Sequence, residues 1–293
     1  MSAHKNAPRS AAQETLPLLM GQGAANAWEC DEMGHLNVRF HVLRLAMGLG
    51  ALARALGMEN AFKPAAGATL LPLDLYIRFQ REVRAGGALL MRGGVLEASD
   101  TEATIYAELR HPDGQPASSF ILRCAHAEPR SMKAFAWAGK ARAAFERLAC
   151  TAPKHGQPRT IDLSHAPRAF DLAKADALGV KRTALSMVLP SDCDAFERLR
   201  LDSYIGRTSD AVPALFGEWR AEAAAALAAQ DGVAREGGSA AVEFRIVFRR
   251  WPRAGDGVEV RSAFVEVMEK ANRVMHWLID PASGAAWASM EAV

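Results

Sequence analysis

The chain has 293 residues, of which 50% are hydrophobic and 23% are charged, and its formal net charge is +2. That length allows one large globular domain or two smaller ones, each with its own core. The small net charge and the absence of a recognised module argue against nucleic-acid binding. The four cysteines (Cys30, Cys124, Cys150 and Cys193) lack C-x-x-C spacing, which argues against a disulfide framework or a zinc knuckle and fits a reducing cytoplasm.

Residues 1–15 are polar and lack the apolar segment of a secretory signal, so they predict a disordered tail on a cytoplasmic protein. The longest apolar run, Leu45 to Leu56, contains Gly48, Gly50 and Arg54. It is shorter than the roughly 20 apolar residues that span a bilayer, so no membrane span is expected.

Residues 16–128 predict one unit, which starts with an entry strand at Leu16–Ala27. A helix is expected at Asn37–Leu56, where apolar residues recur at spacings of 4 and 3, and Gly57 suits the position after its end. Gly48 and Gly50 should each weaken this helix by about 1 kcal/mol, a cost that close packing on a sheet would explain. Turn signals then separate four expected strands: Thr69–Phe79, Ala88–Ala98, Glu102–Arg110 and Pro116–Ala127.

This order of strand, long helix and consecutive strands indicates the α+β class, with a helix wrapped by an antiparallel sheet. Residues 129–182 are expected to form a linker. From Glu128 to Arg182 the chain has 11 Lys or Arg against 5 Asp or Glu, and one helix is predicted at Met132–Leu148.

The first unit then recurs in residues 183–293, where positions match at an offset of 169 (248 − 79). The clearest matches are Phe79 with Phe248, Arg81 with Arg250, Arg84 with Arg253 and Gly86 with Gly255. A second helix is expected at Ser209–Ala229, with Ser209 as its N-cap and a stripe of Val212, Leu215, Trp219, Ala223 and Leu227. Strands are expected at Ala240–Arg249, Val258–Met268, Arg273–Asp280 and Ala285–Val293. The duplication predicts two tandem copies of one α+β unit that form a pseudo-dimer.

The stretch Trp28–Phe40, W-E-C-D-E-M-G-H-L-N-V-R-F, holds the residues best suited to chemistry. Asp31, Gly34, His35 and Asn37 lie within seven residues, directly before the first long helix. The first N–H groups of a helix are unpaired and favour nearby negative charge, and a base or nucleophile beside such donors can attack a carbonyl. Glycine at position 34 would allow close approach of the backbone to that carbonyl.

The spacing Asp31-x-x-Gly34-His35-x-Asn37, before a long helix and a series of strands, resembles the hotdog-fold acyl thioesterases. It is most similar to the branch with an aspartate in a D-x-x-G turn and to the plant acyl-carrier-protein thioesterases with Asp, His and Asn. Because of its duplication, the chain resembles double-hotdog proteins, in which one chain supplies the two units that simpler members assemble as a dimer. The resemblance covers most of the chain, excluding the tail and the linker.

The resemblance implies that Asp31 is the catalytic nucleophile or the general base on water. It also implies that the N–H groups near Gly34 and His35 polarise the thioester carbonyl, while His35 and Asn37 orient the water or the carboxylate. We expect no metal or redox cofactor. The plant pattern has a second asparagine where this chain has Met33, so the complete plant set is not present.

The second copy departs further from the pattern. Asp192-Cys193-Asp194 aligns with Glu29-Cys30-Asp31, but Glu197, Arg198 and Arg200 replace the Gly, His and Asn. We therefore expect one working site per chain, with walls from the second copy. Four polar residues before the expected second helix could face that site or form another: Asp202, Tyr204, Arg207 and Asp210.

Structural roles are the alternatives for each candidate. Asp31 also suits a capping or turn acid, His35 a turn donor and Asn37 the helix N-cap. Cys30 lacks an evident activating partner, and a metal site from Glu29, Asp31, Glu32 and His35 lacks a recognised ligand spacing. The arginines that could bind the phosphates of coenzyme A, or could be solvated charges at strand ends, are Arg81, Arg84, Arg250 and Arg253.

The sequence therefore predicts a double-hotdog acyl-CoA thioesterase of lipid metabolism. Its substrate would be a fatty or aryl acyl thioester of coenzyme A or of a carrier protein. The alternatives are a non-hydrolytic acyl-thioester or lipid-binding protein and an enoyl-CoA hydratase on the same fold. Exposed sheet edges would also allow two chains to pair as a homodimer.

Overall fold

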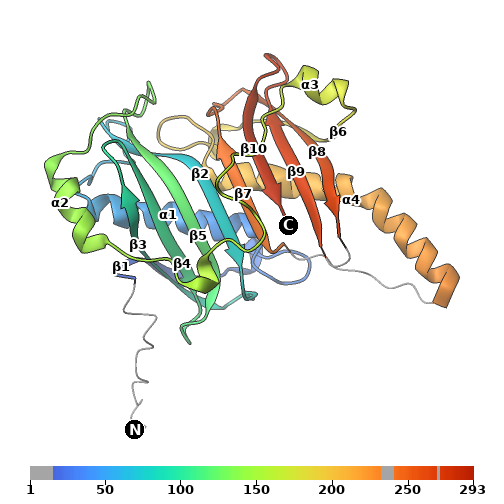
Figure 1. Ribbon diagram of the computed structural model, residues 1–293, viewed down its shortest axis with the longest axis horizontal. Coiled ribbons are helices and arrows are strands. Elements are labelled where there is room, and N and C mark those ends of the chain that lie inside the picture. The colour runs from blue at the N-terminus through green and yellow to red at the C-terminus, as the bar shows by residue number, and fades with distance from the viewer. Residues whose placement is uncertain (1–15, 232–240, 269–270) are drawn as a thin grey trace, which may run out of the picture.

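Ten strands form one antiparallel sheet in the part of the chain that the structure, a computed structural model, describes: residues 16–231, 241–268 and 271–293 (Figure 1). The disordered tail expected at residues 1–15 lies outside this range, as do the side chains of residues 218–231. The order of the strands across the sheet is β1-β3-β4-β5-β2-β7-β10-β9-β8-β6.

The strands of the first unit are β1 (Leu18–Ala24), β2 (Thr69–Phe79), β3 (Ala88–Ala98), β4 (Glu102–Arg110) and β5 (Pro116–Ala127). Those of the second unit are β6 (Lys181–Met187), β7 (Glu243–Phe248), β8 (Gly257–Val267), β9 (Asn272–Ile279) and β10 (Ala286–Ala292). The α-helices are α1 (Val38–Ala55), α2 (Gly139–Leu148), α3 (Leu172–Ala177) and α4 (Leu201–Asp231). Short 3-10 helices lie at Ala27–Glu29, Lys154–Gly156 and Pro190–Asp192. None of the described helices is both long enough and apolar enough to cross a membrane.

The two halves of the sheet contain equivalent strands in mirrored order. Five strands of the first unit are followed by their five counterparts in reverse order, and the equivalent strands β2 and β7 join the two halves. At the centre of this joint Tyr76 pairs with Arg245, and these two positions are themselves related by the offset of 169. A pseudo-two-fold axis therefore passes through this pair, and the predicted pair of tandem hotdog units in one chain is confirmed.

Helix α1 begins and ends where its sequence predicts. The Asn37 side chain accepts a hydrogen bond from the Arg39 N–H at 3.0 Å, and Gly57 follows the helix with φ of 78°. The apolar stripe Val42, Leu45, Leu49, Leu52 and Leu56 is buried. A Cβ on Gly48 would lie 2.9 Å from Met91 Sδ on β3, which confirms the close packing expected there, whereas the space around Gly50 is open and that expectation is wrong.

Helix α4 differs from its prediction. It begins at Leu201 instead of Ser209, so Ser209 is inside the helix and is not its N-cap. Asp202, Tyr204 and Arg207 consequently lie on the first turns of α4 and not before it. The predicted stripe residues Trp219, Ala223 and Leu227 fall outside the described side chains.

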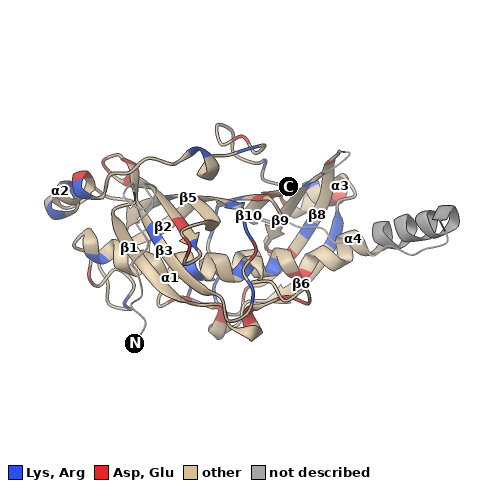
Figure 2. Cartoon of the chain, turned by 90° about the horizontal axis from the view of Figure 1, so that it is seen from below, with Lys and Arg blue, Asp and Glu red and all other residues tan. Residues whose placement is uncertain are grey.

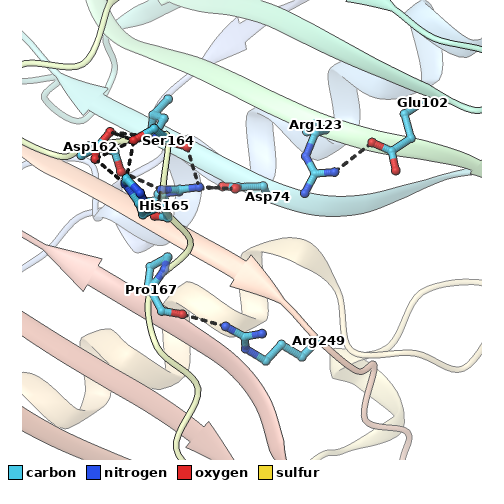
Figure 3. Close-up of polar contacts among 10 residues, drawn as sticks. Asp74, Glu102, Arg123, Asp162, Ser164, His165, Pro167 and Arg249 are labelled. Atoms are coloured by element: carbon cyan, nitrogen blue, oxygen red, sulfur yellow. Dashed lines mark hydrogen bonds and ion pairs between the residues drawn. The ribbon is translucent and has the colours of Figure 1, made fainter.

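Helices α1 and α4 pack on one face of the sheet and the linker crosses the other face (Figure 2). The linker helix is shorter than predicted, because Glu128 accepts the N–H groups of Arg130 and Ser131 in a turn and α2 starts only at Gly139. Beyond α2 the linker contacts the centre of the sheet, where Arg245 donates to the carbonyls of Asp162, Leu163 and His165 (Figure 3). Strand β6 and helix α3, which complete this region, were not predicted.

A buried polar network fixes the linker to β4. Glu108 is fully buried and accepts hydrogen bonds from Tyr106 Oη at 2.5 Å and Arg110 Nε at 2.6 Å. His155 of the linker lies 2.7 Å from the same carboxylate. Because an unsatisfied buried carboxylate is costly, this network favours one position of the linker on the sheet.

Gly156→Ala is expected to destabilise the protein by about 1–3 kcal/mol, because its Cβ would lie 1.8 Å from Tyr106 Oη, in a site packed too tightly to relax. Urea unfolding of the full chain measures this change in the free energy of unfolding. Gly67→Ala is the matched control, since no atom lies within 4 Å of the added Cβ. Equal stability of the two variants would contradict the described packing of the linker.

Candidate functional site

The turn before α1 (turn 1, residues 29–37) is closed by Asp31. Its Oδ1 accepts the backbone N–H groups of Met33 and His35, each at 3.0 Å, and its carbonyl accepts the Gly34 N–H at 2.9 Å. Gly34 has φ of 75°, a conformation that glycine adopts without strain. Asp31 and Gly34 therefore both serve the geometry of this turn.

The backbone donors expected to polarise a thioester carbonyl are occupied inside the turn. The Gly34 N–H donates to the Asp31 carbonyl and the His35 N–H donates to the Asp31 carboxylate. The sequence analysis assigned these N–H groups to the substrate carbonyl. In the structure they donate instead to the carbonyl and the carboxylate of Asp31. The second carboxylate oxygen, Oδ2, has no hydrogen-bond partner among the described residues.

His35 and Asn37 both have structural partners. His35 Nε2 lies 3.0 Å from Glu82 Oε2, in the segment that follows β2. Asn37 caps α1, as its structural alternative stated. Asn37 is thus held at the start of the helix, whereas His35 Nε2 lies near Glu82 without forming a hydrogen bond.

Glu29 belongs to a separate contact. Its carboxylate is buried and pairs with Arg44 of α1 at 2.6 Å, and it accepts the Asn26 N–H at 2.8 Å. Cys30 Sγ donates to the Asn26 carbonyl at 3.4 Å. Glu29 is therefore committed to Arg44, which leaves the metal-ligand alternative without one of its four donors.

The turn before α4 (turn 2, residues 192–200) repeats turn 1 at an offset of 163 (193 − 30). Isolated backbone bridges join Cys30 to Leu36 in turn 1 and Cys193 to Leu199 in turn 2. Asp194 Oδ1 accepts the N–H groups of Phe196 and Arg198 at 2.8 and 3.1 Å, as Asp31 does for its own turn. The alignment of the two motifs from the sequence is thus reproduced residue by residue.

The two equivalent aspartates differ in their second oxygen. Asp194 Oδ2 accepts both Nε and Nη2 of Arg198, at 3.1 and 2.8 Å, and Arg198 is only 3% exposed. The position of Arg198 is that of His35 in turn 1, where none of the described side chains reaches Asp31 Oδ2. Turn 2 also has Glu197 at φ of 63°, where turn 1 has glycine. Turn 1 therefore has the carboxylate that is available for chemistry.

A cavity of about 280 Å³ lies beside turn 2, between α1 and the second unit. Its walls are mainly apolar, and its polar lining comes from Asp194, Arg198, Arg200, Asp202 and Tyr204. Asp202 and Tyr204 thus line a pocket beside turn 2 and do not face turn 1. Arg207 instead pairs with Asp192 at 2.7 Å, and Asp210 is exposed on α4.

Residues 25–144 match the family model of the thioesterase-like superfamily. This range contains turn 1, α1 and strands β2 to β5. This match covers less than half of the chain. No curated protein matches the chain.

Two solved thioesterase structures have similar folds. An acyl-ACP thioesterase from Bacteroides thetaiotaomicron superposes with a TM-score of 0.67 at 14% identity, over 93% of this chain and 96% of that one. The 12:0-ACP thioesterase from Umbellularia californica gives a TM-score of 0.61 at 9% identity, over 93% and 91%. Together with the family match over residues 25–144, these structures confirm the predicted resemblance at the level of the fold.

The four arginines predicted to bind phosphates lie in two places. Arg84 pairs through its backbone with His35 beside turn 1, and Arg81 is an exposed partner of Asp113 at 2.6 Å. Arg253 pairs in the same way with Arg198 beside turn 2. The Arg250 carbonyl accepts the Tyr204 hydroxyl at 3.0 Å.

Sequence analysis did not identify the apolar wall that α1 provides to the cavity beside turn 2. Leu43, Ala46 and Met47 form this wall, and Trp251 completes it from beyond β7. The signal in the sequence that could have revealed this wall was the repeat itself, with its offset of 169 between the strands and 163 between the turns. A two-fold relation between the units places the middle of each helix beside the turn of the other unit.

Proposed function

We propose that this protein is an acyl-CoA thioesterase that hydrolyses a fatty or aryl acyl thioester at turn 1, with Asp31 as its catalytic carboxylate. The observation that carries the proposal is the contrast between the equivalent aspartates. Asp31 keeps one oxygen without a partner in the described structure, while Arg198 occupies that oxygen of Asp194. An unpaired carboxylate held by two backbone donors through its other oxygen is a positioned base or nucleophile.

As a general base, Asp31 would take a proton from water while the water oxygen attacks the thioester carbon. The tetrahedral intermediate then collapses, the C–S bond breaks, and the thiolate of coenzyme A takes up the proton. As a nucleophile, Asp31 would form an acyl anhydride with loss of the thiolate, and water would hydrolyse it. Both routes yield one carboxylic acid and one thiol per thioester.

The N-terminus of α1 is our candidate for stabilising the oxyanion, because the Gly34 and His35 N–H groups are used within turn 1. Asn37 caps the helix through Arg39, and the first helical residue is Val38. Early N–H groups of a helix have no intrahelical acceptor and carry partial positive charge. His35, held by Glu82, would orient the water or the acyl group beside them.

Arg84 is our candidate for binding a phosphate of coenzyme A at this turn, since it lies next to His35 and is exposed. Arg81 would assist from the same segment, and Arg250 and Arg253 would serve turn 2. We further propose a cytoplasmic enzyme of lipid metabolism without a metal or redox cofactor, in keeping with four free cysteines. Pairing of two chains through the edge strands β1 and β6 is the proposed homodimer.

The test is a hydrolysis assay of the full chain with acyl-CoAs of increasing chain length and with benzoyl-CoA. We expect free thiol and free acid in equal amounts for at least one substrate. Tight acyl-CoA binding without thiol release would instead identify a non-hydrolytic binding protein. Addition of water to an enoyl-CoA without thiol release would identify a hydratase.

A further inference from the structure

The side chain of Arg39 crosses from the first turn of α1 to the first turn of α4. Arg39 is the second residue of α1, and its N–H is the one that Asn37 accepts at 3.0 Å. Its guanidinium donates from Nε to Asp202 Oδ2 at 3.1 Å and from Nη2 to Ser203 Oγ at 3.5 Å. The same residue is therefore held by turn 1 through its backbone and by the second unit through its side chain.

Helix α4 comes so close to Arg39 that a side chain at position 206 would press on it. A Cβ on Gly206 would lie 3.1 Å from Arg39 Cδ and 3.4 Å from Arg39 Nη1, in a buried part of α4. The guanidinium thus lies against the backbone of the helix that also provides its two hydrogen-bond acceptors. This packing leaves the stem of Arg39 little freedom to move.

Asp202 is itself fixed at this place. Its carboxylate is 1% exposed and accepts Arg200 Nε on Oδ1 at 3.1 Å and Arg200 Nη2 on Oδ2 at 3.2 Å. Because the carboxylate is buried, loss of its charge would leave two guanidinium groups close together without a counter-ion. Asp202 therefore connects turn 2, through Arg200, with the start of α1, through Arg39.

We infer that Asp202 is a positioning residue for the hydrolysis proposed at turn 1. It acts through Arg39, whose ion pair holds the first turn of α1 in a fixed position against α4. The inference rests on the proposed function, in which the free N–H groups at this end of α1 stabilise the oxyanion. Such donors are effective only at a defined place, because a displacement of about 1 Å can cost roughly 10²-fold in rate. The second unit thus contributes to the chemistry of the first without touching the substrate.

Asp202→Asn is expected to lower kcat about tenfold or more with the best acyl-CoA substrate and to leave KM nearly unchanged. The reason is that the affected donors act on the oxyanion, which forms only after the substrate has bound. Asp192→Asn is the matched control, because Asp192 pairs with Arg207 of α4 at 2.7 Å, within the second unit, and it should retain the wild-type kcat. A wild-type kcat in Asp202→Asn, or an equal loss in both variants, would overturn the positioning role.

A double-mutant cycle tests whether the effect passes through Arg39. Arg39→Gln should lower kcat as much as Asp202→Asn does, because each variant breaks the same pair. The double variant should lose no more than either single variant. Additive losses would show that Asp202 acts by another route and would overturn the inference.

Gly206→Ala presses on the stem of Arg39 without removing a charge, and it should fold because alanine favours a helix. We expect kcat to fall about two- to tenfold. Gly217→Ala is the control on the same helix, since no atom lies within 4 Å of its added Cβ, and it should keep the wild-type kcat. Equal kcat in these two glycine variants would contradict the role of Arg39.

Amide hydrogen exchange at the start of α1 separates this inference from the proposed function, since it requires no turnover. The N–H groups of Arg39 and Phe40 both donate to Asn37, and in Asp202→Asn we expect them to exchange about tenfold or more faster than in the wild type. Asp192→Asn should leave their exchange unchanged. Without this difference the inference fails even in an active enzyme. If the wild type hydrolyses no acyl-CoA, the proposed function fails, and the exchange rates alone decide whether Asp202 positions α1.

Discussion

Asp31→Asn is expected to reduce thioester hydrolysis by roughly 10²- to 10⁴-fold, the usual contribution of a positioned acid–base group. An asparagine oxygen can still accept the N–H groups of Met33 and His35, which keep turn 1 closed. The substitution therefore removes the charge of the carboxylate and retains the fold. The measurement is kcat and KM with the best acyl-CoA substrate, and the loss should fall mainly on kcat.

Glu32→Gln is the matched control, because Glu32 is the exposed neighbour of Asp31 and undergoes the same change from acid to amide. We expect wild-type kinetics for this variant. A full hydrolytic rate in Asp31→Asn would remove Asp31 from the mechanism. An equal loss in both variants would show that general surface charge, and not the turn carboxylate, is responsible.

Acidification is expected to lower the free energy of unfolding by about 4 kcal/mol between pH 7.5 and pH 5, about 2 kcal/mol for each of two buried histidines. Burial lowers the pKa of His41 from 6.5 to about 4, and nearby Arg44 and His111 add to this effect. Burial has the same effect on His276, whose pKa is also about 4. The folded state keeps both rings neutral, so the unfolded chain binds protons first as the pH falls below 6.5. This stability is present above pH 6.5 and is lost progressively toward pH 4.

Urea unfolding at several pH values measures this dependence. His276→Gln should reduce the slope by about half, since glutamine can replace the hydrogen bond to Ser262 Oγ, now 2.8 Å long, without titrating. His165→Gln makes the same change at an exposed histidine, whose side chain is 88% exposed, and serves as the control for the substitution itself. Identical slopes for the wild type and His276→Gln would contradict the assignment of a buried neutral ring.

The strands of the first unit follow from the sequence because glycine and proline turns separate them, and β2 to β5 have the predicted bounds. The start of α4 could not be predicted in this way. Arg200 occupies the position of the capping Asn37, and an arginine side chain cannot accept a hydrogen bond from a helix N–H. Ser209 was therefore the first capping residue in the sequence, although the helix already begins at Leu201.

Turn 1 was predictable because its residues are close in sequence. Asp31 accepts the N–H groups of the turn, Gly34 takes the positive φ, and Asn37 caps the helix. The partner of His35 and the arginine on Asp194 depend on side-chain directions that spacing does not determine. The cavity depends on contacts between α1 and turn 2, about 150 residues apart in sequence. Only the pseudo-two-fold relation brings such segments together.

The pair of Arg39 and Asp202 has a consequence for the history of the chain. These positions are equivalent by the offset of 163, and they meet each other at 3.1 Å across the axis that relates the units. In a homodimer of the first unit alone, Arg39 would face a second arginine, and in a homodimer of the second unit Asp202 would face a second aspartate. Like charges at this distance repel, and one of them would be buried. At this point on the axis each half is thus electrostatically better matched to the other than to a second copy of itself.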